Sequence, residues 1–172
     1  MTMASVAARL GAPTGSIYHR FRSREELMAE TWLAAAESFQ AGFIAALAEP
    51  SEPPGVRAAL HAIQWARAHP TPARLVVLYR RRDFVAGPLP QPLRPRAELL
   101  GADLEAALSG FAATALGSTD PGGRQLAAFL LLDVPYAAVR RYLAVGMDPP
   151  PLVEGLVRRA FEALARPEPG PD

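Results

Sequence analysis

Arginine supplies the anion-binding chemistry near the N-terminus. Residues 1–24 carry Arg9, Arg20, Arg22 and Arg24 and no acidic side chain, and the first carboxylate is that of Glu25. Guanidinium groups bind phosphate through paired hydrogen bonds as well as through charge. On a chain whose net charge is only +1, this local excess of positive charge indicates a surface that binds a phosphate backbone.

Small and hydrogen-bonding residues lie between these arginines. Thr14, Gly15 and Ser16 are small enough for a helix that carries them to approach a groove wall closely. Tyr18 and His19 add a phenol and an imidazole that can donate to phosphates. Together with the arginines, these residue types indicate nucleic-acid binding.

Two short helices and the start of a longer one must position these side chains. Gly11 can end a helix in the left-handed conformation, and apolar residues recur at helical spacing on both sides of it: Val6, Ala7 and Leu10 before, Ile17, Tyr18 and Phe21 after. Ser23 and Glu26 then predict a capping box at the start of the longer helix. The pattern is typical of a helix-turn-helix. The alternative is an ordinary pair of short helices whose basic residues are simply solvated.

The segment from Val6 to Leu27 strongly resembles the DNA-binding segment of TetR-family transcriptional regulators. The features that carry the resemblance are the Gly11 turn, the Ile17-Tyr18-x-x-Phe21 core, and a basic residue ahead of Glu25-Glu26-Leu27. The strong likeness covers residues 4–30. The rest of the chain resembles the family only in the number, order and length of its helices.

The resemblance implies a role for each residue that matches the motif. Recognition-helix positions that meet the major groove correspond to Thr14, Gly15, Ser16 and His19. Positions that usually hold phosphates correspond to Tyr18 and Arg24. The implied partners are a double-stranded DNA operator, a small-molecule effector of unknown identity, and a second copy of the chain.

The sequence departs from the family pattern at two places. The turn reads Ala12-Pro13-Thr14, where a small hydroxyl residue followed by proline is commoner, so the cap falls to Thr14 or is missing. The family's first helix would precede Thr2. We expect either that the true start of the chain lies upstream, or that this form exposes apolar area of the motif, at about 25 cal/mol per Å², and binds DNA poorly. Two hypotheses follow: a ligand-responsive repressor released from a palindromic operator, or a helical small-molecule-binding dimer that has lost sequence-specific DNA binding.

The amino-acid composition excludes several other classes of site and of catalysis. The 172 residues include no cysteine, and all 18 basic residues are arginine. Disulfides, thiolate metal sites, thiol catalysis, Schiff-base lysines and Walker-type phosphate loops are therefore excluded. No nucleophile–base or carboxylate pair has supporting spacing, so we expect neither an enzyme nor a cofactor. Without a signal peptide or a spanning apolar segment, we expect a soluble cytoplasmic protein.

Proline divides the chain into helices. The 18 prolines cluster at helix boundaries, and between the clusters apolar residues recur at spacings of three and four. We expect an all-α protein of about eight helices, with a helix-turn-helix module over 1–30, a helical-bundle domain for effector binding and dimerisation over 31–166, and a disordered tail over 167–172. The short run Leu75–Leu78 could be a strand, but it lies within a helical frame.

The larger part of the chain offers candidates for an effector pocket and a dimer interface. The candidate effector contacts are His61, Trp65, Tyr79, Phe111, Asp133 and Tyr136, with His69 and Phe84 as further options. His61 and His69 would lie about 12 Å apart on one helix face, too far to share a metal, so we expect no metal site. The last two long helices, near 122–146 and 151–166, resemble the pair that forms the family's four-helix dimer bundle, although burial within the monomer is the alternative.

Overall fold

The structure is a computed structural model that describes residues 15, 19–79 and 88–165. Over these residues the chain forms helices and connecting turns and no strand, which confirms the all-α prediction. The predicted turn at Gly11, the candidates Thr14, Ser16, Tyr18 and Phe84, and the predicted tail over 167–172 lie outside the described residues.

The helices follow one another with short connections. Their bounds are α3 (Arg24–Ala48), α4 (Val56–Ala68), α5 (Pro70–Leu78), the 3₁₀ turn η2 (Gln91–Leu93), α6 (Arg94–Ala115), α7 (Pro121–Ala128), the π-helical turn η3 (Phe129–Asp133), α8 (Val134–Ala144) and α9 (Leu152–Leu164). Proline marks several of these boundaries, as predicted, because α5 begins at Pro70 and α7 at Pro121. The run Leu75–Leu78 ends helix α5 and is not a strand.

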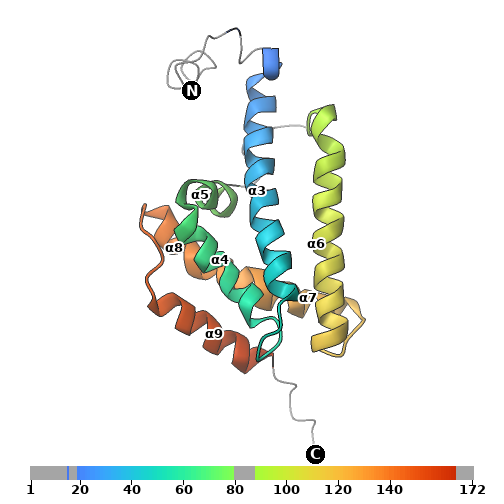
Figure 1. The fold of residues 1–172 in the computed structure, drawn as a ribbon, viewed down its shortest axis with the longest axis vertical. Coiled ribbons are helices and arrows are strands. Elements are labelled where there is room, and N and C mark those ends of the chain that lie inside the picture. Colours follow the sequence, from blue (N-terminus) through green and yellow to red (C-terminus); the bar gives the residue numbers. More distant parts are fainter. Residues whose placement is uncertain (1–14, 16–18, 80–87, 166–172) are drawn as a thin grey trace, which may run out of the picture.

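Two long helices stand beside a cluster of shorter ones. Figure 1 shows α3 and α6 running side by side with their N-terminal ends at the same end of the molecule. The shorter helices gather around the C-terminal half of α3, where α4 is buried along most of its length. The main core includes the fully buried side chains of Phe43, Ile63, Leu131 and Phe161.

The predicted helix over 122–146 is interrupted near its centre. The backbone N–H of Val134 donates to the carbonyl of Phe129, five residues back, which inserts a π-helical turn between α7 and α8. Pro135 follows at the start of α8 and has no N–H to offer the carbonyl of Leu131. The helix is therefore irregular just before Pro135, where it forms a π-helical turn.

Arg67 of α4 binds the start of α9 through hydrogen bonds and an ion pair. Its Nε donates to the carbonyl of Pro149 over 2.7 Å and its Nη2 to that of Pro150 over 2.9 Å. Its Nη1 forms an ion pair with Glu154 in the first turn of α9. Among the described residues, no helix is long and apolar enough to cross a membrane.

Candidate functional site

The start of α3 is held by side chains that satisfy its free backbone donors. The Ser23 hydroxyl accepts from the backbone N–H of Glu26 over 3.1 Å. The Glu26 carboxylate reaches back to the backbone N–H of Arg22 over 2.8 Å. The predicted capping box is confirmed, except that Glu26 bonds the residue before the cap. Two reciprocal bonds thus fix the direction in which the basic segment joins α3.

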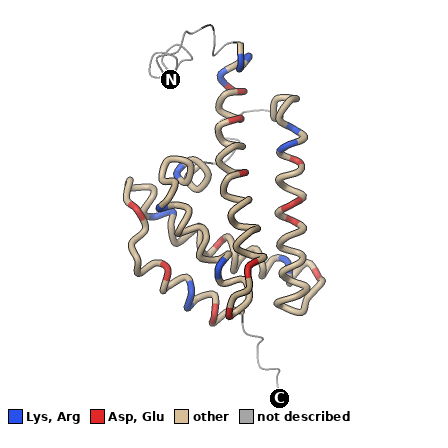
Figure 2. Tube along the Cα trace, in the orientation of Figure 1, with Lys and Arg blue, Asp and Glu red and all other residues tan. Residues whose placement is uncertain are grey.

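The basic segment presents its guanidinium groups to solvent. Arg20, Arg22 and Arg24 are all exposed, and Arg20 lies over the ring of Phe21, with 5.8 Å from Cζ to the ring centroid. Figure 2 shows basic residues at the N-terminal end of α3 and acidic residues farther along the helix. None of the three arginines forms an ion pair with a described residue, so their guanidinium groups are available to an external anion.

The candidates for groove contact are described only in part. Gly15 and His19 are both helical and exposed, and an added Cβ at Gly15 would meet no atom within 4 Å. The surface at Gly15 is therefore open to close approach by another molecule. Thr14, Ser16 and Tyr18 lie outside the described residues, so their placement relative to His19 and Arg24 stays a prediction.

Some of the candidate effector residues converge on a side chain that sequence reasoning missed. The ring of Phe39 lies 5.2 Å from that of His61, 5.3 Å from that of Trp65 and 5.4 Å from that of Tyr136, measured between centroids. Phe39 also stacks on Phe43 at 6.1 Å. The helical spacing of Phe39 and Phe43 predicts a buried face, but it gives no sign that Phe39 is the centre of the cluster.

Burial sets the electrostatics of this aromatic cluster. Burial lowers the pKa of His61, and the hydrogen bond of 3.1 Å between its Nε2 and the carbonyl of Phe39 opposes part of that shift. Burial also raises the pKa of the Tyr136 phenol. The indole Nε1 of Trp65 is buried and finds no hydrogen-bond partner in the described part of the chain. The cluster therefore favours neutral groups.

The remaining candidates lie apart from this cluster. Phe111 packs against Phe161, with 6.4 Å between ring centroids. Tyr79 is 48% exposed at the end of α5, where its carbonyl accepts from the indole of Trp32. Asp133 is exposed in the π-helical turn. The structure thus brings His61, Trp65 and Tyr136 together and leaves the other three elsewhere.

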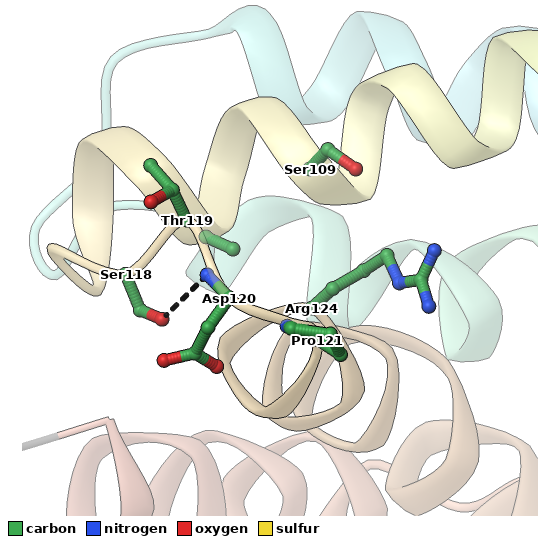
Figure 3. A pocket seen from close by; sticks show the side chains of 7 residues that line it. Ser109, Ser118, Thr119, Asp120, Pro121 and Arg124 are labelled. Carbon is green, nitrogen blue, oxygen red and sulfur yellow. Dashed lines mark hydrogen bonds between the residues drawn. The ribbon is translucent and has the colours of Figure 1, made fainter.

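Two hollows occur at other places on the surface. One is a groove between α3 and α6 with a cavity volume of about 200 Å³. The other, of about 160 Å³, lies at the turn from α6 to α7 and is shown in Figure 3. In that turn Asp120 accepts from the backbone N–H of Gly123, and its own N–H donates to Ser118. These polar groups serve to cap α7, and neither hollow is lined by a predicted effector residue.

Large apolar side chains face solvent on the last helices. The exposed side chains include Leu126 on α7 and Phe129 in η3. On α9 they are Leu152, Leu156 and Leu164. The inner face of α9 is buried through Val153, Val157 and Phe161. Helix α9 is therefore apolar on two faces, only one of which is covered within the monomer.

Comparison with known proteins gives one match. Residues 1–31 match the family model of bacterial regulatory proteins, tetR family. No curated protein and no solved structure matches the chain. The matched segment contains the helix-turn-helix pattern and the capping box, and it ends within the second turn of α3.

Proposed function

We propose that the chain is a DNA-binding transcriptional regulator of the tetR family, and that it is a repressor released from a palindromic operator by a small-molecule effector. The match over residues 1–31 carries this proposal. The exposed arginines ahead of α3 support it, because most protein–DNA hydrogen bonds go to phosphate and sugar. A repressor of this kind acts in the cytoplasm and is a regulator rather than an enzyme.

In the proposed complex the recognition helix lies in the major groove. Gly15 and His19, with Thr14 and Ser16, face base edges, and Tyr18 and Arg24 hold phosphates. The module over residues 1–30 includes the first residues of α3, so movement of that helix changes the position of the recognition helix. The helical domain over 31–166 binds the effector and the second copy of the chain.

The proposed homodimer forms through α7–α8 and α9. Exposed Leu152, Leu156 and Leu164 support this surface, because several large apolar side chains exposed on one helix would be covered by a second copy of the chain. A two-fold dimer places two recognition helices about one turn of DNA apart, which suits a palindrome. Effector binding then favours a spacing of these helices that no longer fits the operator.

The DNA-binding proposal is tested by fluorescence anisotropy of a labelled duplex from the region upstream of the gene. We expect a complex that unlabelled specific DNA displaces and random DNA does not, with affinity that falls steeply as salt rises. Arg24→Ala should weaken binding to all sequences and reduce the salt slope by about one, and His19→Ala should relax sequence preference. Arg57→Ala, at an exposed ion pair on α4, is the matched control and should change neither.

Absence of any sequence-specific complex at low salt would refute the proposal. The chain would then be the helical small-molecule-binding dimer that does not read an operator. The dimer is tested separately by sedimentation velocity, where Leu156→Glu should give monomers. Leu99→Glu, at an exposed leucine on α6, should leave the dimer intact.

A further inference from the structure

The groove between α3 and α6 contains polar atoms that have no hydrogen-bond or ion-pair partner among the described residues. Gln40 on α3 is the one buried polar side chain among the described residues, with 7% exposure, and it lines this groove. Its Nε2 donates to the carbonyl of Leu100 over 2.8 Å. No donor in the described part of the chain reaches its Oε1. This Oε1 is not among the buried side-chain atoms that lack a partner, so it is open to the groove, where a ligand that donates to it would take the place of solvent.

The donors around the groove are already engaged. The Arg96 guanidinium binds Glu37 through Nε and Nη2, over 2.9 and 2.7 Å, and binds Glu30 through Nη1 over 2.7 Å. All three nitrogens of Arg96 therefore have carboxylate partners. Asp103, which also lines the groove, forms no ion pair with any described residue. The free hydrogen-bonding capacity of the groove thus consists of acceptors and carries negative charge.

The walls of the groove are apolar. Ile44 and Ala41 of α3 face Leu99 and Leu100 of α6, and Leu99 is 62% exposed. A volume of about 200 Å³ is below the usual range for drug-sized ligands, so the groove suits a small molecule. An apolar body can cover Leu99 while a cationic head meets the acceptors.

We propose that the groove between α3 and α6 binds a small organic cation with an apolar body, held by the Asp103 carboxylate and the Gln40 carbonyl. This inference rests on the proposed function, because it assigns the effector site and the class of effector. A ligand wedged between the helices would act directly on α3, which begins at the basic segment. The aromatic cluster around Phe39 lies on a different face of the same helix.

The test is calorimetric titration of the full chain, without DNA, with the probe 4-phenylbutylammonium. Two probes of the same carbon skeleton, 4-phenylbutanol and 4-phenylbutanoate, separate charge from apolar contact. We expect saturable binding of one cation per chain, weaker binding of the alcohol, and no binding of the carboxylate. Equal binding of all three probes, or no saturable binding of the cation, would overturn the proposal.

Substitutions locate the site. Asp103→Asn should weaken binding of the cation by about two- to fivefold, the range for a solvent-exposed ion pair, whereas Glu98→Gln removes the same charge from α6 outside the groove and should change little. Ala41→Phe should fill the groove and abolish binding, and Ala34→Phe, also exposed on α3, is its control. If Ala41→Phe fails to fold, Gln40→Met and Asp103→Asn still test the groove, because each removes one of the two groups proposed to hold the cation.

Other outcomes separate this inference from the proposed function. Loss of binding in Trp65→Phe but not in Asp103→Asn would place the ligand at the aromatic cluster and overturn the groove assignment. A specific operator complex combined with no probe binding refutes the groove and leaves the regulator intact. Probe binding that follows the groove variants, in a chain that forms no operator complex, refutes the regulator and leaves the groove.

Discussion

Replacing Arg67 should loosen α9, the helix that carries much of the proposed dimer face. In the structure its guanidinium meets the carbonyls of Pro149 and Pro150 and the carboxylate of Glu154. Pro149 is among the most deeply buried of the described residues. Removing the guanidinium therefore leaves a buried carbonyl without its donor as well as breaking an ion pair.

The magnitude follows from these contacts. A hydrogen bond from a charged group contributes about 1.5–3 kcal/mol, so the two bonds to carbonyls account for roughly 3 kcal/mol. The ion pair adds at most about 1 kcal/mol, because its partners Arg67 and Glu154 are 30% and 32% exposed and solvent screens them. We expect Arg67→Ala to lower the free energy of unfolding by about 3–4 kcal/mol.

Two further variants separate the contribution of the hydrogen bonds to the free energy of unfolding from that of the ion pair. Arg67→Lys keeps the charge but cannot present a planar fork to several acceptors, so we expect it to lose about 2 kcal/mol. Glu154→Gln removes only the ion pair and should lose at most about 1 kcal/mol. The measurement is urea unfolding at one fixed protein concentration, since dimerisation makes stability depend on concentration. A loss below about 1 kcal/mol for Arg67→Ala, or an equal loss for Glu154→Gln, would refute the reasoning.

Four other predictions concern the cap of α3, the titration of His61, the turn at Gly55 and an exposed glycine on α6. Ser23→Ala should cost about 1 kcal/mol by removing the cap of α3, which a thermal melt will measure. The pKa of His61 is lowered in the folded chain, so the unfolded chain binds more protons as pH falls below about 6.5. Stability should therefore decrease on acidification through that range, and His61→Gln should remove this part of the pH dependence of urea unfolding. Gly55→Ala should destabilise by at least about 1–2 kcal/mol, because φ is +85° and the new Cβ would clash with Phe111. Gly101→Ala, in open space on α6, should instead be stabilising by about 0.5–1 kcal/mol.

Patterns that involve near neighbours in the chain were predictable. The capping box joins Ser23 and Glu26 within a single turn, and the proline clusters stop helices through local sterics. Helical periodicity likewise predicted the class of fold, because each amphipathic helix shows its own spacing. The match to the TetR family covers this same kind of local motif.

The contacts of the effector candidates could not be predicted from patterns within single helices. Aromatic side chains at helical spacing indicate burial, but not which partner each one meets. Phe39 lies between His61, Trp65 and Tyr136, whereas Phe111 turns to Phe161. The choice depends on how helices distant in the sequence pack, and no single-helix pattern contains that information.

The sequence by itself determined the capping box at the start of α3, the basic character of the residues just before it and the all-α class of the described chain, because capping, charge and helical spacing act over a few residues. Only the tertiary structure decided which surfaces the helices offer. The groove depends on Gln40 meeting Leu100 and on Arg96 meeting Glu30 and Glu37. Those contacts join residues about sixty positions apart, and packing of the whole chain is what brings α3 and α6 together.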